Sequence, residues 1–499
     1  MPSNSQPQIG GKVRRLRRQR QISQAGLAAA IGISASYLNL IEHNRRQITV
    51  PLLLKLAGYF GIEAGELAQS DDSQLSGDLM EIFGDDIFAD TDITNQDIYD
   101  LASSNPAIAR AVLLLFDKYQ GHNGEKDKSG SNSQNNNSPH HLATDAISDF
   151  IQENANYFPS LEDAAKRVRS DIDNASSDFE TGLKTYLRNV FGLDWRTISL
   201  PTGVASRQQA NSYVFETSNI LPIETSLFFA SRHAGMQAAK NEIRDIINSS
   251  TLPLSSQDSP EQNSTPDNSF AKENYITNTQ NPASDAYSLA QNILASYFAA
   301  ALIMPYEPFL KACFDLRYDV ERISRLFNAS FEQVCQRMTS LQRPSAPGIS
   351  LHLVRTDIAG NISKRFSLSG IHIPRHSGAC PRWNVYSAFL QPGRTNIQLS
   401  QMPGGEIYFC IARSFEKGAF SHNAQRRHFS IGIGCHISHA DRMIYSDGID
   451  LGNISQIVPI GVGCRICPRM ACEQRVQPPA DHRFKINQSE HPESLYGRL

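Results

Sequence analysis

Hydrophobic residues recur at helical spacing through most of the first 345 positions. Between residues 143 and 248, segments such as "FETGLKTYLRNVFG" and "SLFFASRHAGMQAAKNEIRDIINS" carry apolar residues every three or four positions, which gives a helix one apolar face. The pattern resumes in "AYSLAQNILASYFAAALIMPYEPFLKACFDL" and in "VERISRLFNASFEQVCQRMTSLQ", where Ser330 is placed to cap a helix. We therefore expect a mostly α-helical middle domain over residues 143–345.

From residue 349 onward the spacing changes from helical to alternating. Apolar and polar residues alternate, as in strands with one buried face, in "ISLHLVRTDIAGNISKRFSLSGIHI", "NIQLSQMPGGEIYFCIARSF" and "RRHFSIGIGCHIS". The run Pro403-Gly404-Gly405 is typical of a hairpin turn. We expect an α+β C-terminal domain over residues 346–480, with cysteine-rich loops, followed by a tail at 481–499.

Two polar segments interrupt these patterns. Residues 121–142 read "GHNGEKDKSGSNSQNNNSPHHL", and a similar segment spans about 249–284. Both are rich in Ser, Asn, Gln, Pro and Asp, and both nearly lack aliphatic residues. Such segments cannot bury enough apolar surface to offset the entropy lost on ordering. We expect both to be disordered insertions, the second of them inside the middle domain.

Charge is distributed unevenly along the chain. The net charge of −3 excludes a uniformly basic nucleic-acid coat. Residues 10–60 nevertheless hold nine Lys and Arg residues against Glu42 alone, whereas residues 71–100 hold ten Asp and Glu residues. A basic head of this kind is typical of a phosphate-binding surface. The acidic part belongs to an expected helical connector over residues 69–120.

The basic head has the signals of a helix-turn-helix. Ser23 and Ser34 are placed to cap two successive helices, and Gly32 allows the tight turn between them. With "SQAGLAAAIGISASYLNLIEHNRRQITVPLLLKLAGYFGI", residues 10–68 resemble the lambda-repressor/Cro type of helix-turn-helix in a five-helix arrangement. The resemblance implies a double-stranded DNA partner. It also implies DNA contacts from Gln24, Ser34, Ser36, Tyr37, Asn39, Asn44 and Arg46.

The middle domain resembles the ImmA/IrrE metallopeptidase type without its catalytic motif. The similarity lies in "SLFFASRHAGMQA", "ASYFAAALIMP" and "FEQVCQRMTSLQ". Active members carry H-E-x-x-H, in which two histidines bind zinc and the glutamate is the general base. Here Ser231 and Gly235 stand at the two histidine positions and Arg232 at the glutamate position. We therefore expect no enzymatic activity, and we interpret His233 as a surface or core residue.

Eight cysteines divide into two groups. Cys313, Cys335 and Cys410 fall in helix or strand patterns and are expected to pack as small hydrophobic residues. Five others lie beside Gly or Pro or on expected loops and are candidate metal ligands, namely Cys380, Cys435, Cys464, Cys467 and Cys472. The Cys-x2-Cys-x4-Cys spacing favours an iron–sulfur cluster, then zinc, then redox thiols. Cys380 and Cys435 compete for the fourth ligand position.

Over nearly its whole length except the insertions, the chain resembles the short-chain fatty acyl transcriptional regulators. The resemblance is carried by "MPYEPFL", "RYDVERISRLFNASFEQVCQRMTSLQRP", "TDIAGNISKRFS", "GACPRWNVYSAFLQPGR", "GCHISHADRMIYSDGIDL" and "IGVGCRICPRMACEQR". It implies a regulator of propionate or acetate metabolism, such as the methylcitrate or glyoxylate pathway, that responds to acyl-CoA. It also favours a [4Fe–4S] cluster. A redox-sensing factor without an acyl-CoA ligand stays open, and a zinc peptidase that cleaves a repressor is opposed by the missing ligands.

An acyl-CoA sensor needs cations for the phosphates and an apolar slot for the acyl group. Arg355, Lys364 and Arg365 are the candidate phosphate ligands, with exposed strand charges as the alternative. Tyr306, Phe309 and Tyr318 are candidates for the slot, with ordinary core packing as the alternative.

Two sequence features that we do not find, a secretory signal and a membrane-spanning run, bear on where the protein is expected in the cell. The N-terminus lacks the apolar region of a secretory signal, and the longest apolar run that we identify, "YFAAALIMP", is too short to span a membrane. We expect a cytoplasmic protein with no membrane partner, in a compartment where thiols stay reduced. The helix-turn-helix at residues 10–68 further favours DNA binding as a symmetric homo-oligomer, either a dimer or a tetramer.

Overall fold

The computed structural model describes most of the chain. The described residues are 10–20, 22–42, 46, 48–60, 72–88, 91, 93, 95–126, 139–201, 203–208, 213–250, 252, 282–375, 379–418 and 426–477. The central parts of both expected insertions, the expected fifth helix of the head and the tail at 481–499 lie outside them.

The basic head contains four described helices around its own core. These are α1 (Gly10–Gln19), α2 (Gln24–Ile31), α3 (Ala35–Glu42) and α4 (Val50–Phe60). Both predicted caps are confirmed, because the Ser23 hydroxyl accepts the Gly26 N–H at 3.0 Å and the Ser34 hydroxyl accepts the Tyr37 N–H at 3.1 Å. Gly32 ends α2 with a φ of 74°, and α2 and α3 meet at 106°. These local signals produce the helix-turn-helix.

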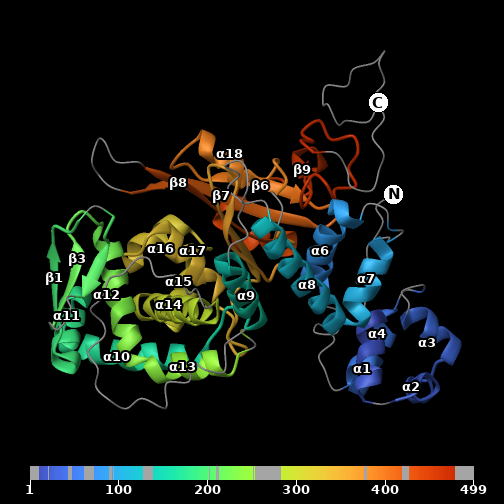
Figure 1. Ribbon diagram of the computed structural model, residues 1–499, viewed down its shortest axis with the longest axis horizontal. Coiled ribbons are helices and arrows are strands. Elements are labelled where there is room, and N and C mark those ends of the chain that lie inside the picture. Colours follow the sequence, from blue (N-terminus) through green and yellow to red (C-terminus); the bar gives the residue numbers. More distant parts are fainter. Residues whose placement is uncertain are drawn as a thin grey trace.

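The acidic connector is a small helical bundle. It consists of α6 (Asp72–Phe83), the 3-10 turn η1 (Asp86–Phe88), α7 (Asn95–Ser104) and α8 (Pro106–Lys126). Leu79, Ile98 and Phe116 are among its buried residues. The bundle lies between the head and the rest of the molecule, and α7 contacts α1 (Figure 1).

The first insertion is shorter than predicted. Helix α8 continues to Lys126, and the next helix, α9 (Pro139–Glu153), begins at Pro139. Residues 121–126 and 139–142, which the sequence analysis placed in the insertion, thus belong to these two helices. The reason is that helix propagation adds one backbone hydrogen bond per residue and can extend a helix beyond its apolar part.

The middle domain is mainly helical and contains a small sheet. Its helices are α9, α10 (Pro159–Ala175), α11 (Phe179–Phe191), α12 (Ile223–Ala238), α13 (Lys240–Asn248), α14 (Pro282–Ile303), α15 (Tyr306–Asp315), α16 (Val320–Phe327) and α17 (Phe331–Thr339). Ser330 caps α17 as predicted, in a capping box with Gln333. The sheet has the order β1-β3-β2 and is formed by β1 (Asp194–Ile198), β2 (Ser206–Gln208) and β3 (Val214–Ser218).

Helix α14 is the central helix of the middle domain. Its window Ala286–Ile303 has the length and hydropathy of a membrane span, so the prediction that no apolar run approaches that length was wrong. More than half of this window is buried, and α14 contacts α9, α10, α12 and α13. Burial among other helices explains its composition, since a core helix is apolar on most of its surface.

The C-terminal domain is built on a six-stranded sheet of order β5-β4-β8-β7-β6-β9. Its strands are β4 (Leu351–Asp357), β5 (Ile362–Ser367), β6 (Asn396–Gln401), β7 (Ile407–Lys417), β8 (Arg427–His436) and β9 (Ile457–Pro459). Neighbouring strands are antiparallel except for β6 and β9. The predicted hairpin turn lies between β6 and β7, where the Gly405 N–H donates to the Met402 carbonyl at 3.0 Å.

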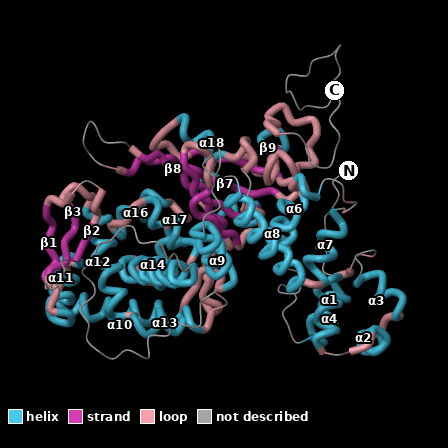
Figure 2. The backbone as a smooth tube through the Cα atoms, in the orientation of Figure 1, coloured by secondary structure: helices cyan, strands magenta, loops and turns pink. Residues whose placement is uncertain are grey.

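The two faces of this sheet are covered differently, as Figures 1 and 2 show. One face packs on the helices α14–α17 in a shared core that includes Leu353, Ile433 and Cys435. The other face is covered by the short helix α18 (Asn384–Ser387) and by loop segments, in a second core that includes Val354 and Cys380. We call these the helix face and the loop face. Because successive strand residues point to opposite faces, one position along a strand decides which core a side chain joins.

Candidate functional site

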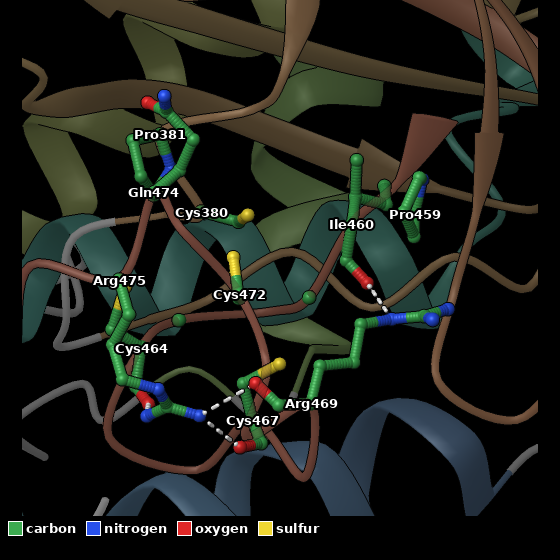
Figure 3. A pocket seen from close by; sticks show the side chains of 12 residues that line it. Cys380, Pro381, Pro459, Ile460, Cys464, Cys467, Arg469, Cys472, Gln474 and Arg475 are labelled. Carbon is green, nitrogen blue, oxygen red and sulfur yellow. Dashed lines mark hydrogen bonds between the residues drawn. The ribbon is translucent and has the colours of Figure 1, made fainter. Parts of the chain in front are cut away.

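Four cysteines line one hollow at the edge of the loop face. Cys380 comes from the segment before α18, and Cys464, Cys467 and Cys472 come from the loop that follows β9. The hollow contains about 300 Å³ of space. In Figure 3 the sulfur atoms of Cys380 and Cys472 point toward each other. All eight cysteines of the chain are free thiols.

A buried arginine holds the loop that carries three of these cysteines. The guanidinium of Arg475 donates to the carbonyl oxygens of Cys464 at 2.5 Å and Cys467 at 2.7 Å, and Arg475 is only 4% exposed. Arg469 similarly donates to the carbonyl oxygen of Ile460 at 3.1 Å. Hydrogen bonds from a charged donor to several carbonyls fix the loop more firmly than neutral bonds would. Both arginines also bring positive charge to a site lined by thiols.

Further hydrogen bonds join Cys380 and its neighbours to the same loop. The Cys380 N–H donates to the Val462 carbonyl at 2.8 Å. Three residues after Cys380, the indole of Trp383 donates to the Gly461 carbonyl at 2.9 Å. Gly461 itself has no room for a side chain, because a Cβ there would lie 2.7 Å from the sulfur of Cys467. The four thiols are therefore held together by backbone contacts as well as by the loop itself.

The four thiols form the donor set of either a zinc ion or an iron–sulfur cluster, and their spacing bears on the choice between them. No three of the four sulfurs lie within 4.8 Å of one another. Among the described residues, that spacing is met by a different group, Asp78, Glu81 and His372. Zinc would need sulfur–sulfur separations of about 3.8 Å, given Zn–S bonds of ~2.3 Å in a tetrahedron. A cubane cluster places four irons between its cysteine sulfurs and therefore fits wider spacing. Burial raises the pKa of the Cys380 and Cys467 thiols, so both are neutral unless a metal binds them.

Cys435 lies away from this site. It was grouped with the candidate ligands because it follows Gly434, but it belongs to strand β8 and points to the helix face, where it is fully buried. Its thiol contacts the sulfur of Met443 at 3.8 Å, and burial raises its pKa. Strand alternation thus separates it from Cys380. The other three cysteines, Cys313, Cys335 and Cys410, are buried in the two cores as the sequence pattern predicts.

A second cavity, which the sequence did not reveal, lies on the loop face beside the cysteine site. It contains about 310 Å³ of space and is lined by His352, Val354, Ile371, Trp383, Asn384, Val385, Gln398, Ser400, Cys410, Gly432, Ile433 and Ile460. Ile460 also lines the cysteine site. The ring of His352 contacts the Ser369 hydroxyl at 2.8 Å, and burial lowers its pKa to about 3, which keeps it neutral. An apolar cavity with a few fixed polar groups is the usual form of a small-molecule site.

The aromatic residues considered for the acyl slot lie elsewhere. Tyr306, Phe309 and Tyr318 pack in the core on the helix face, and none of them lines this cavity. The two tyrosine hydroxyls are occupied: Tyr306 donates to the Ala346 carbonyl, and Tyr318 accepts the Ile349 N–H, each at 3.0 Å. Their role in the described structure is core packing.

The three predicted phosphate ligands divide between two places. Arg355 and Lys364 lie beside the carboxylate of Glu332, at 2.8 Å and 3.8 Å, and Lys417 joins them there. Burial of Glu332 is outweighed by the attraction of these three cations, which together lower its pKa to about 2. Lys417 was not among the candidates drawn from the sequence. Arg365 instead faces α9, with Asp145 at 3.5 Å. The cation group at Glu332 thus carries three positive charges against one negative charge.

The predicted DNA-contacting residues lie on and around α3. Ser36 and Asn39 are exposed, Ser34 is the cap of α3, and the guanidinium of Arg46 lies 5.5 Å from the ring centre of the half-buried Tyr37. Asn44 lies outside the described residues. The amide of Gln24 donates to the Asn39 side chain at 3.1 Å, so α2 and α3 are joined at their outer surface.

The arginine cluster of α1 is partly structural, which the sequence did not indicate. Arg17 makes a bidentate ion pair with Glu42, at 2.6 Å and 2.9 Å, and the Glu42 side chain is fully buried. Gln24 also donates to Glu42 at 2.9 Å. Arg20 donates to the carbonyl oxygens of Tyr59 and Phe60 at the end of α4. These two arginines hold the head together and are less available to phosphates.

The degenerate metallopeptidase positions are filled by packing. Ser231 is fully buried, and a Cβ at Gly235 would lie 2.6 Å from the ring of Phe298 in α14. The space into which a second histidine would project is therefore occupied by an aromatic ring. His233 stacks on Phe215 with 4.4 Å between ring centres, and burial lowers its pKa. It packs in this part of the fold, in agreement with the interpretation drawn from the sequence.

Three family models match parts of the chain. They are a helix-turn-helix model at residues 13–67, an IrrE N-terminal-like domain at 269–339, and the C-terminal domain of short-chain fatty acyl coenzyme A regulators at 340–496. The head, part of the middle domain and the sheet with its cysteine loop are each represented.

Curated proteins resemble nearly the whole chain. The HTH-type transcriptional regulator RamB of Mycobacterium tuberculosis is 32% identical over 99% of both chains. The HTH-type transcriptional regulator PrpR of the same species is 30% identical, over 96% of this chain and 93% of that protein. A propionyl-CoA carboxylase regulator of Cereibacter sphaeroides is 33% identical over 96% of both. A solved structure of a Mycobacterium tuberculosis transcriptional regulator has 30% identity and a TM-score of 0.62, covering 72% of this chain and 100% of that one.

Proposed function

Because the chain belongs to the family of short-chain fatty acyl coenzyme A regulators, and is a DNA-binding transcriptional regulator of short-chain acyl metabolism, we propose that it senses an acyl-CoA and carries an iron–sulfur cluster. The observation that carries this proposal is the position of the loop-face cavity directly beside the four-cysteine site. The two share Ile460, and Trp383 lines the cavity while its indole is bonded to the cysteine loop.

Cys380, Cys464, Cys467 and Cys472 are the proposed cluster ligands. A [4Fe–4S] cluster, when bound, would supply a centre whose charge and integrity depend on redox conditions. The protein's contribution is to hold four thiols on a stiff loop and to place Arg469 and Arg475 beside them. These cations would offset the negative charge that four thiolates introduce.

The loop-face cavity is the proposed site of the acyl group. Val354, Ile371 and Val385 offer an apolar surface, and Asn384 and Ser400 offer polar groups. The cavity is small, which suits a short acyl chain better than a long one. The relative named as a propionyl-CoA carboxylase regulator favours a three-carbon acyl group. Regulated genes would then belong to propionate or acetate metabolism, such as the methylcitrate or glyoxylate pathway.

The phosphates of the effector are assigned to the cation group at Glu332, formed by Arg355, Lys364 and Lys417. Lys364 and Lys417 have side chains 44% and 47% exposed, so both can reach a ligand while Glu332 holds their positions. Lys364 lies on β5, the edge strand of the sheet, where an extended ligand has access. The acyl and phosphate assignments are independent and can fail separately.

The decisive experiment combines DNA binding with ligand binding on the full-length protein. Electrophoretic mobility shifts on the protein's own upstream region should change when propionyl-CoA or acetyl-CoA is added, and both effectors should raise the melting temperature, because a ligand that binds the native state stabilises it. A second candidate, a cluster-based redox sensor without an effector, is favoured by the cysteine site alone. It predicts shifts that respond to oxidation and not to acyl-CoA. Absence of both acyl-CoA effects would overturn the proposal in favour of that candidate.

A further inference from the structure

A buried group of metal-ligand side chains joins the connector to the C-terminal domain. Asp78 and Glu81 lie three residues apart on α6, so both face the same side of the helix. His372 comes from the segment that follows β5. One ligand atom of each residue lies within 4.8 Å of the other two. Neighbouring ligand atoms around an ion with bonds of ~2.0–2.2 Å are about 3–3.5 Å apart, so the three side chains would draw slightly closer together on binding an ion.

His372 is the observation that distinguishes this group from an ordinary acidic surface. Its side chain is buried, with the residue only 7% exposed, and neither ring nitrogen has a hydrogen-bond partner. Buried side-chain nitrogens usually have a hydrogen-bond partner. Two ring nitrogens without one therefore require an explanation. The position of the ring, with one nitrogen beside two carboxylates, is that of a metal ligand.

Helix α6 makes room for this imidazole. Gly77 lies inside the helix, and a Cβ there would lie 2.3 Å from Nδ1 of His372. Glycine in a helix interior costs about 1 kcal/mol relative to alanine, so its presence has to be compensated by a packing reason. The close approach of His372 supplies that reason. The imidazole is therefore held against the helix one residue before Asp78.

Two arginines lie beside the group of Asp78, Glu81 and His372. Arg375 donates its backbone N–H to Glu81 at 2.7 Å, and its guanidinium lies 3.4 Å from Asp78 and also contacts Asp149. Arg365 contacts Asp145 and Asp149. Three carboxylates, those of Asp78, Asp145 and Asp149, thus lie beside two guanidinium groups, while Glu81 accepts a backbone N–H.

We propose that Asp78, Glu81 and His372 bind a divalent transition-metal ion, of the class that includes Zn²⁺ and Mn²⁺. The imidazole argues against Ca²⁺ and Mg²⁺, which prefer all-oxygen ligands. The ion would fasten α6 to the C-terminal domain. Gly84, directly after the end of α6, lies against the cysteine loop, because a Cβ there would lie 2.9 Å from the side chain of Ile466. The same helix therefore connects this ion site, the cysteine loop and, through its bundle, the DNA-binding head. The proposal does not depend on the acyl-CoA assignment.

Manganese binding by the full-length protein tests this site separately from the thiols, because Mn²⁺ prefers oxygen and nitrogen ligands to thiolates. Loss of the free Mn²⁺ signal in electron paramagnetic resonance should show one bound ion per chain, which equimolar Zn²⁺ displaces. His372→Gln and Glu81→Gln should each weaken binding at least tenfold. Asp173→Asn removes an exposed carboxylate on α10 and should leave binding unchanged.

Circular dichroism establishes that each variant is folded before its binding is compared. Two substitutions at different ligands guard against the failure of either one to fold. The proposal is overturned if the wild-type chain binds no Mn²⁺, or if folded His372→Gln binds it as tightly as the wild type. It is supported if Mn²⁺ raises the melting temperature of the wild type and of Asp173→Asn, but not of His372→Gln.

Discussion

The backbone N–H of Cys380 donates a 2.8 Å hydrogen bond to the carbonyl oxygen of Val462. This bond brings Cys380, which precedes the β6–β7 hairpin, to the loop that carries Cys464, Cys467 and Cys472. The fourth thiol of the site is thus supplied by a distant segment, and the cysteine loop is joined to the domain core through Trp383 as well.

Cys380→Ala should abolish the cluster, whereas Cys435→Ala should retain it. Alanine provides no ligand at position 380, while Cys435 lies on the helix face in contact with Met443. Anaerobically purified wild type and Cys435→Ala should be brown with about four irons per chain, and Cys380→Ala should be colourless. Iron analysis and visible absorption decide the outcome. Full iron in Cys380→Ala would remove Cys380 from the ligand set, and stoichiometric zinc without iron in the wild type would replace the cluster by a zinc site.

The parts of this site that the sequence revealed are those encoded by neighbouring residues. Cys464, Cys467 and Cys472 were recognised by spacing. The fourth ligand stayed open between Cys380 and Cys435, because Gly or Pro lies beside both and the sequence does not show which of them meets the loop with the other three cysteines. Strand alternation on β8 separates them, and the register needed to see this comes only from pairing with β4 and β7.

The same distinction holds for the fold. The helices of the head follow from Ser23, Gly32 and Ser34, whose effects are local. The sheet β1–β3 was missed because strands of three to five residues are too short to show alternation. The Arg17–Glu42 pair and the loop-face cavity were not visible either, since each depends on residues far apart in the sequence that meet only after folding.

Val354→Ala should shift the preferred effector toward a longer acyl chain. Val354 lines the loop-face cavity, and removing two methyl groups enlarges it. A pocket discriminates one methylene by roughly 1–3 kcal/mol, so the ratio of butyryl-CoA to propionyl-CoA affinity should rise about tenfold or more. Leu353→Ala is the control, because the adjacent residue points to the helix face. Calorimetric titration of both variants measures the ratio, and an equal shift in both would place the acyl group elsewhere.

Arg17→Ala should destabilise the head, although it lies in the basic cluster. Removing Arg17 leaves the buried Glu42 carboxylate without its ion partner, which costs about 3–5 kcal/mol. Arg14→Ala, in the same helix, should keep the fold and weaken binding to all DNA sequences, with a smaller dependence on salt. Thermal unfolding and binding to operator and random DNA separate the two effects. A folded Arg17→Ala with uniformly weaker binding would show that Arg17 acts mainly on phosphates.

Asn39→Ala should reduce sequence discrimination while leaving nonspecific binding intact. Asn39 is exposed on α3 and is positioned by Gln24 at 3.1 Å. Loss of a good base contact costs about 1–3 kcal/mol on the operator and almost nothing on random DNA. Tyr37→Ala should behave similarly if its ring reaches a base. Footprints on the operator provide the measurement, and unchanged footprints for both variants would mean that α3 does not read bases.

Acidification should weaken the fold through His352, and His352→Gln should remove that part of the pH dependence. Burial lowers the pKa of His352 to about 3, below the ordinary value of 6.5, so the unfolded chain binds this proton more readily than the native one between those values. The contribution of His352 to the free energy of unfolding is therefore fully present above pH 6.5. It falls by about 1.4 kcal/mol per pH unit down to about pH 3.

From pH 7 to pH 5 the free energy of unfolding should drop by about 2 kcal/mol less in His352→Gln than in the wild type. His372, whose pKa burial also lowers to about 3, is common to both proteins and cancels in this comparison. Denaturant unfolding at the two pH values measures the difference, and equal drops would show that His352 is not held neutral by its surroundings.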